Sequence, residues 1–294
     1  MRYITIEEDV LGLAYALAAL MSFGLSPILY KIGLGNRSLH IIEANTLRAW
    51  GSLILLTPML VNSCSLETLS DYALLLISLS AILGPIIGDT LFMYSIRGIG
   101  VSIATPIVNS YSLIVTAISV IFFNEQLTLI NALGGFLIIL SLWILYFEKK
   151  ELSRKVIAGM LAGLGTAFMW ALSIISMKQA LTMEVSPVVI IFLRTLIVAI
   201  LLSLISKALK LSFKGKIDVK TAVSLSVGGF FGIGFGVIML LYAIKVLGAG
   251  KASLIASASP VMATFLAILL LKEKLRIRAV IASVLVAIGA VLLK

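Results

Sequence analysis

The chain has 294 residues, of which 61% are hydrophobic and only 12% are charged. Soluble domains are about 45–50% apolar and about 25% charged, so a water-soluble fold could not cover this much apolar surface, and a membrane protein is expected. The formal net charge of +10 comes from basic residues spread over short loops between apolar runs, which favours contact with lipid head groups and argues against nucleic acid as a partner.

Metal and thiol chemistry are not expected. Cys64 is the only cysteine and His40 the only histidine, so one chain cannot assemble a disulfide, a zinc cluster or a Cys/His pair. No metal site and no cofactor are therefore predicted. No enzymatic activity is expected either, because an intramembrane enzyme would need convergent acids, a histidine or a metal set, and one acid inside a span is too little.

Apolar runs long enough to cross a bilayer follow one another along the whole chain. A spanning helix needs about 20 predominantly apolar residues. Ten runs meet this requirement, at residues 11–33, 41–62, 72–96, 101–123, 127–147, 156–178, 186–206, 221–244, 251–271 and 277–293. They are continuous rather than alternating, which excludes transmembrane strands. The segment MRYITIEEDV lacks the positive start of a secretory signal, so the first run is expected to be a retained helix.

The sequence contains one pattern twice. Landmark residues recur at a nearly constant separation of about 147 residues: Gly12, Lys31, Arg48, Gly84, Gly88 and Glu125 return as Gly159, Lys178, Arg194, Gly232, Gly236 and Glu273. Residues 1–150 and 151–294 are therefore predicted to be two five-helix repeats. Because five is odd, the second repeat enters the membrane from the opposite side, and the fold class is an all-α membrane protein with ten transmembrane helices in two inverted repeats, a design typical of transporters.

The two signatures within these repeats resemble those of EamA-type carriers of the drug/metabolite transporter superfamily. The second repeat carries LLYAIKVLGAGKASLIASASPVMATFLAILLLKEKL and the first MYSIRGIGVSIATPIVNSYSLIVTAISVIFFNEQL. The resemblance covers nearly the whole chain. It implies ten helices around a central cavity lined mainly by spans 1, 3, 4, 6, 8 and 9, and the export or exchange of small metabolites, most often amino acids. One departure is that Ser112 faces Pro260 in the repeat, while the proline of the first half is Pro106.

Polar residues next to helix breakers are the first candidates for substrate binding. A proline inside a membrane helix frees a backbone carbonyl, which must face protein, water or a ligand. Pro260 with Ser257 and Ser259 around it, and Asn109 and Tyr111 in the matching segment, are therefore predicted to line the cavity. For the serines the alternative is that their hydroxyls bond to preceding carbonyls and merely pack.

Asp89 is the most informative charge, because an acid about two turns inside a span is expensive and usually functional. It is expected either to couple transport to a proton or cation, or to bind a substrate amine. The alternative is a structural pair with Arg48 or Arg194, both several residues inside their spans. These arginines could instead hold a carboxylate or phosphate, pair across the repeats, or extend toward head groups.

Trp170, which has Phe23 at its repeat position, is predicted to wall the cavity, although an aromatic in a membrane helix is more often a packing residue. Glu125 and Glu273 stand at the water boundary. Each is predicted to be a structural turn residue that accepts hydrogen bonds from free amides at the start of the following helix.

The sequence thus predicts a multi-pass cell-membrane carrier that exports or exchanges small polar metabolites, amino acids or related compounds, by alternating access. Its partners would be a small-molecule substrate, the lipid bilayer and a coupling proton or cation. A nucleotide-sugar or sugar-phosphate exchanger is the alternative, and a lipid-acting intramembrane enzyme is a remoter one. Lys and Arg gather in the loops after odd-numbered spans, which predicts both termini outside, whereas the family resemblance implies cytoplasmic termini.

Overall fold

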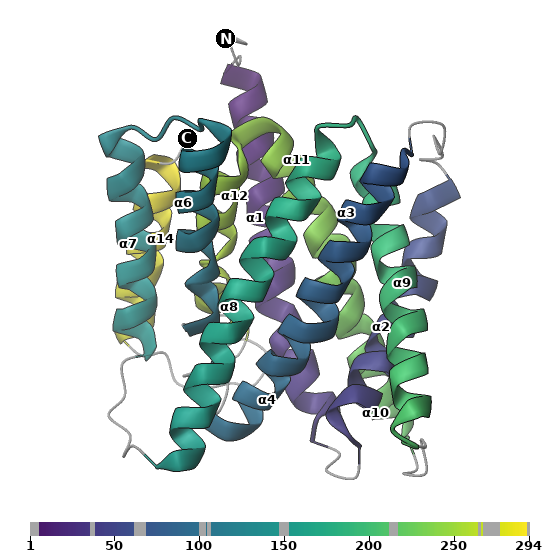
Figure 1. The fold of residues 1–294 in the computed structure, drawn as a ribbon. Helices are drawn as coiled ribbons and strands as arrows, with labels where there is room; N and C mark the ends of the chain where they lie inside the picture. Colours follow the sequence, from purple (N-terminus) through teal and green to yellow (C-terminus); the bar gives the residue numbers. More distant parts are fainter. Residues whose placement is uncertain are drawn as a thin grey trace.

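The protein is a bundle of long helices, shown in Figure 1 by a computed structural model that describes residues 6–35, 39–61, 69–99, 104, 107–146, 153–211, 217–263, 266 and 277–292. Every regular element among the described residues is a helix, and none of these residues lies in a strand. The all-α fold class is therefore confirmed.

The elements follow the order expected from the repeat. In the first half they are α1 (Ile6–Gly33), α2 (Ile41–Val61), α3 (Asp71–Ala81), the π-helical segment η2 (Ile82–Gly88), α4 (Asp89–Ile99), α6 (Tyr111–Phe123) and α7 (Leu129–Tyr146). In the second half they are α8 (Arg154–Leu181), α9 (Pro187–Ala208), α10 (Val219–Gly229), the π-helical segment η3 (Phe230–Phe235), α11 (Gly236–Leu247), α12 (Ala249–Ala256) and α14 (Ile277–Leu292).

The third long helix of each half is interrupted by a π-helical segment at the same repeat position. It consists of α3, η2 and α4 in the first half and of α10, η3 and α11 in the second. In η2 the amide of Asp89 donates to the carbonyl of Gly84, and in η3 the amide of Gly236 donates to the carbonyl of Phe231. These five-residue steps define π-helix, which is rare, occurs mostly as a single turn inside an α-helix and is frequent at functional sites. In the first half the π-turn leads directly into Asp89.

The two halves interlock. Helix α1 packs against α10, η3 and α11, and its repeat counterpart α8 packs against α3, η2 and α4. Helix α2 contacts α9, α6 contacts α12, and α7 contacts α14. In Figure 1 α1 runs downward from the labelled N-terminus while α8 runs upward. The opposite directions are those that an inverted repeat requires.

Side chains at the helix ends explain where several helices begin. Ser70 accepts a hydrogen bond from the amide of Ala73 at 3.1 Å to cap α3, and Ser153 accepts one from Val156 at 3.3 Å to cap α8. Such caps satisfy amides that have no partner within the helix. At the other end of α6, Asn124 adopts a left-handed conformation with φ of 51° and ends the helix.

The exposure pattern is that of a protein surrounded by lipid. Large apolar side chains such as Ile54 and Phe122 are 67% and 74% exposed, while Asn45 and Thr166 are fully buried. Five described helical rods are long and apolar enough to span a bilayer: Asp9–Gly33, Asp71–Ile99, Arg154–Leu181, Pro187–Ala208 and Val219–Leu247. Ile107–Phe123 and Leu129–Ser141 are shorter apolar helices.

Candidate functional site

A cavity of about 100 Å³ lies between the two halves. Since a single water needs about 10–15 Å³ by this kind of measure, the cavity has room for several waters or one small molecule. Its aromatic and polar lining residues are Phe23, Tyr30, Phe92, Tyr111 and Trp170 with Ser26, Arg48, Asp89, Asn109, Ser173, Arg194 and Ser259. Both repeats therefore contribute aromatic, polar and charged side chains to one site.

Most of the residues selected from the sequence meet at this cavity. Asp89, Asn109, Tyr111 and Trp170 line it. Arg48 of α2 and Arg194 of α9 also line it, and both are buried. These two helices are not among the lining spans that the family resemblance implies.

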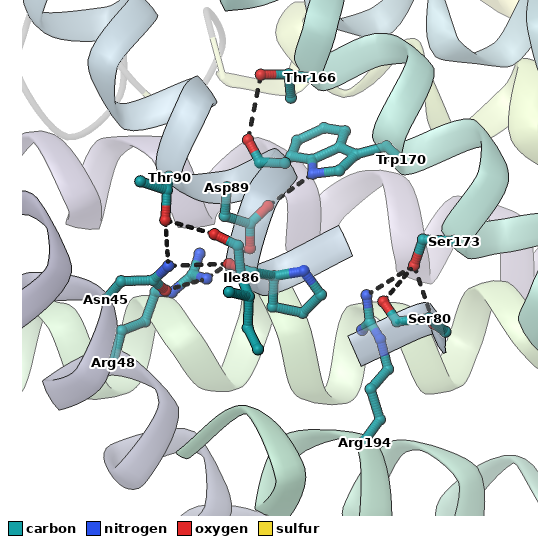
Figure 2. Close-up of polar contacts among 12 residues, drawn as sticks. Asn45, Arg48, Ser80, Ile86, Asp89, Thr90, Thr166, Trp170, Ser173 and Arg194 are labelled. Carbon is teal, nitrogen blue, oxygen red and sulfur yellow. Dashed lines mark hydrogen bonds and ion pairs between the residues drawn. The ribbon is translucent and has the colours of Figure 1, made fainter. Parts of the chain in front are cut away.

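Asp89 is held by two donors from different helices. Its Oδ2 pairs with Nη2 of Arg48 at 2.5 Å, and its Oδ1 accepts a hydrogen bond from Nε1 of Trp170 at 2.7 Å (Figure 2). Asp89 is 4% exposed and Arg48 is 1% exposed. The ion pair lies within the first repeat rather than across the repeats, and the indole of α8 joins it to the second repeat.

Asn45 connects this ion pair to the π-turn. Its Oδ1 accepts a hydrogen bond from Arg48 Nη2 at 2.6 Å, while its Nδ2 donates to the carbonyl of Pro85 at 2.9 Å. From the other side Thr166 donates to the carbonyl of Gly88 at 3.1 Å. Carbonyls of the π-turn thus bond to side chains of α2 and α8, which is how irregular backbone is tolerated at membrane depth.

Arg194 lies in a different polar group, shown on the right of Figure 2. Its Nη2 donates to Oγ of Ser173 at 3.3 Å, and Ser173 in turn donates to the carbonyl of Ser80 at 2.9 Å. A Cβ atom added to Gly84 would collide with both the Ser173 hydroxyl and the Arg194 guanidinium. The glycine therefore makes room for these two side chains.

Aromatic rings form much of the cavity wall. Trp170 meets Phe92 and Tyr111 edge-on, with ring centroids 5.4 Å and 5.8 Å apart. The indole lies directly against Gly88, where a Cβ atom would clash with it. The guanidinium of Arg48 lies 5.0 Å from the ring centre of Tyr30, a cation–π distance.

Of the residues predicted to line the cavity around Pro260, Ser259 does so, whereas Ser257 and Pro260 do not. Ser257 is buried, and its hydroxyl donates to the carbonyl of Leu254 at 2.7 Å, which is the packing alternative stated above. Pro260 is buried next to Ser259. Pro106 lies outside the described residues.

Glu125 accepts hydrogen bonds from a helix that was not expected. Its carboxylate bonds to the amides of Ala249 and Gly250 at 2.8 Å and 3.0 Å, at the start of α12 in the second repeat, and pairs with Lys178 of α8. The following helix α7 is capped instead by Thr128 and Asn131. Glu273, the repeat counterpart, lies outside the described residues.

Sequence reasoning missed Asn45, Tyr30 and Ser173. The asparagine could have been found, because an amide three residues before Arg48 inside an apolar span must find a partner in the protein. Tyr30 and Ser173 carry no such signal, because tyrosines and serines are common in membrane helices and pack there.

A membrane-embedded bundle of two interlocked repeats around a shared polar cavity is the architecture of a transporter. The model of the EamA-like transporter family matches residues 10–147 and 157–294, so the chain belongs to this family. It is 28% identical over 286 residues to an uncharacterized transporter of Archaeoglobus fulgidus, covering 97% of this chain and 98% of the relative. A solved crystal structure of a protein shares the fold with a TM-score of 0.78 at 13% identity, covering 96% of this chain and 95% of that one. The protein is therefore a membrane transporter.

Proposed function

We propose that the protein is a secondary transporter that exports or exchanges small polar metabolites, amino acids or related compounds, across the cell membrane. The observation that carries this proposal is the cavity of about 100 Å³ to which both repeats contribute charged, polar and aromatic side chains. A site of this size suits a small metabolite, and its mixed lining suits a solute with both a charged group and an apolar part.

The proposed mechanism is alternating access with ten membrane crossings, in which residues 1–150 and 151–294 rock against each other around the cavity. Two inverted halves can adopt two equivalent packings, each of which opens the shared site to one side. The substrate contacts proposed are Asp89, Asn109, Tyr111 and Trp170, with Ser259 in the place first given to Ser257 and Pro260.

A nucleotide-sugar or sugar-phosphate exchanger is the competing substrate class. It would use Arg48 and Arg194 together, and both line the cavity. The pairing of Arg48 with Asp89 leaves only one of these cations without an acid partner among the described residues, which favours a singly charged group over a phosphorylated one.

Thermal unfolding of the purified protein in detergent tests the substrate class. A ligand at 100 times its Kd should add about 2.7 kcal/mol to the free energy of unfolding, a readily measured rise in Tm. We expect amino acids to stabilise the protein and nucleotide sugars, sugar phosphates and lipophilic cations to have no effect. Stabilisation confined to the phosphorylated ligands would replace this proposal by the exchanger. Exchange of the stabilising solute in proteoliposomes then tests transport itself.

A further inference from the structure

Arg194 is a buried cation without an acid partner among the described residues. It is 5% exposed, and the ion pairs in this part of the chain join Arg48 to Asp89 and Lys178 to Glu125. The charged side chains that line the cavity are Arg48, Asp89 and Arg194, which leaves a net charge of +1 there, and the acid is ion-paired with Arg48 rather than with Arg194.

The second repeat lacks polar side chains at the positions equivalent to those that bind Arg48 in the first repeat. Arg48 and Arg194 are repeat counterparts, but Asn45 corresponds to Ile191 and Asp89 corresponds to Val237. Ile191 and Val237 are both buried apolar residues, at 0% and 6% exposure. The second repeat has therefore kept the arginine while carrying apolar side chains where the first repeat has an amide and an acid.

Most hydrogen-bond donors of Arg194 have no acceptor. Only Nη2 donates, to Ser173, whereas Nε and Nη1 are buried and lack any partner among the described residues. An uncompensated buried charge with unused donors is expensive. The guanidinium is planar and always charged, and it forms strong charge-assisted hydrogen bonds to a carboxylate.

We propose that Arg194 is the anion-binding residue of the cavity and that it receives the carboxylate of a small solute. Tyr111 and Trp170, which line the same cavity, would contact the remainder of that solute. Identifying this ligand as the transported substrate rests on the proposed function. Binding at Arg194 itself does not, because it can be measured without transport.

Matched pairs of solutes test the charge requirement. The purified full-length protein is heated with propionate, alanine, leucine or phenylalanine, and in parallel with the corresponding carboxamides. We expect at least one carboxylate to raise the Tm with an apparent affinity at least about tenfold above that of its amide, because the amide cannot form charge-assisted hydrogen bonds with Arg194. Equal shifts within every pair, or no shift with any carboxylate, would overturn the proposal.

Variants then locate the site. Arg194→Gln should lose the carboxylate shift and Arg194→Lys should keep part of it, while Lys207→Gln, which removes an exposed charge from the same helix, should behave as wild type. A carboxylate shift that survives in Arg194→Gln would refute the assignment.

A second substitution keeps Arg194 and gives it an acidic partner. Val237→Asp places an acid at the position equivalent to Asp89, so it should neutralise Arg194 and abolish the carboxylate shift in a chain that still contains Arg194. Undiminished carboxylate binding in Val237→Asp would contradict the proposal even if Arg194→Gln fails to fold.

Transport measurements distinguish a failure of this inference from a failure of the proposed function. If carboxylates bind through Arg194 but are not exchanged in proteoliposomes, the site stands and the proposed function fails. If proteoliposomes exchange carboxamides as well as carboxylates and Arg194→Gln retains this activity, the transporter stands and the anion site fails.

Discussion

Asp89 shows how one buried carboxylate can serve both structure and transport. Its two oxygens bond to Arg48 and Trp170, which come from different halves of the chain. Any proton, cation or substrate amine that reaches Asp89 therefore competes with these donors. Such competition would link occupancy of the cavity to the contact between the repeats.

We expect Asp89→Asn to destabilise the protein. The amide has nearly the same shape but leaves the buried Arg48 without a counterion, and breaking a buried pair in this way typically costs about 3–5 kcal/mol. The Tm measured in detergent should fall accordingly. Arg194→Gln serves as the comparison, since it removes a charge that has no acid partner and should leave the ligand-free Tm equal or higher. Equal losses in the two variants would contradict this difference.

The transport role of Asp89 requires a separate measurement. In proteoliposomes with an imposed pH or cation gradient, Asp89→Asn should no longer accumulate substrate against its gradient. If the pH dependence of transport is the same in the variant and the wild type, Asp89 is not the coupling group.

At the scale of single elements, the π-turn η2 and helix α8 fit together through glycines. Gly88 touches the indole of Trp170, and a Cβ atom there would overlap the ring. We expect Gly88→Ala to displace the indole from Asp89 and so to change the tryptophan fluorescence and weaken ligand binding in the cavity. Gly165→Ala, where a Cβ atom meets only a side-chain methyl of Leu91, is the matched control and should have a small effect.

Helix α10 provides an element whose stability should vary with pH. Asp218 caps it by accepting a hydrogen bond from the amide of Thr221 at 2.8 Å, and hydrogen bonds from the hydroxyl and amide of Thr221 lower the pKa of Asp218. Since the folded pKa lies below the unfolded one, the cap stabilises the helix above the unfolded pKa and loses this effect as the pH falls through the folded pKa.

Amide hydrogen exchange in the first turn of α10 checks this. Protection, corrected for the intrinsic pH dependence of exchange, should decline only at a pH below the usual range of an aspartate. Asp218→Asn, which keeps a good capping side chain but does not titrate, should show no such decline. A decline of the same size in Asp218→Asn would exclude Asp218 as its cause.

At the scale of the whole molecule, Glu125 of the first repeat forms bonds to the second repeat at the end where α6 finishes and α12 begins. Its carboxylate bonds to Lys178 and to two amides of α12, and Gly248, with φ of 82°, lets the backbone pass close to it. Because the partners of this carboxylate among the described residues all belong to the second repeat, separation of the repeats at this end must break these bonds.

We therefore expect Glu125→Gln to increase access to the cavity from this end. In a Cys64→Ser background, a cysteine placed at the lining position Met177 should react severalfold faster with a membrane-impermeant maleimide when Glu125 is replaced by Gln. Thr128→Ala, which alters the cap of α7 without touching Glu125, should not change the rate. An unchanged rate in Glu125→Gln would show that these bonds do not close the cavity.

The fold could be predicted from the sequence much further than the site. Apolar runs and a repeated set of glycines and charges depend only on the order of residues, so helices and two similar halves could be predicted from the sequence. The bonds of Glu125 to α12, and the choice of Ser259 over Ser257 as the lining residue, depend on how distant helices pack, which the residue order does not give. The pairing of Asp89 with Arg48 was among the alternatives, but no pattern in the sequence separated Arg48 from Arg194.

The matching positions of η2 and η3 also bear on the history of the chain. Two separate insertions at the same repeat position are a less economical explanation than one, so the simplest order of events places the π-turn in a five-helix ancestor before its gene was duplicated. The difference between Asp89 and Val237 can only have arisen after that duplication. By this order both copies inherited the π-turn from the ancestor, and the charge asymmetry of the cavity arose later, when the two copies were free to diverge.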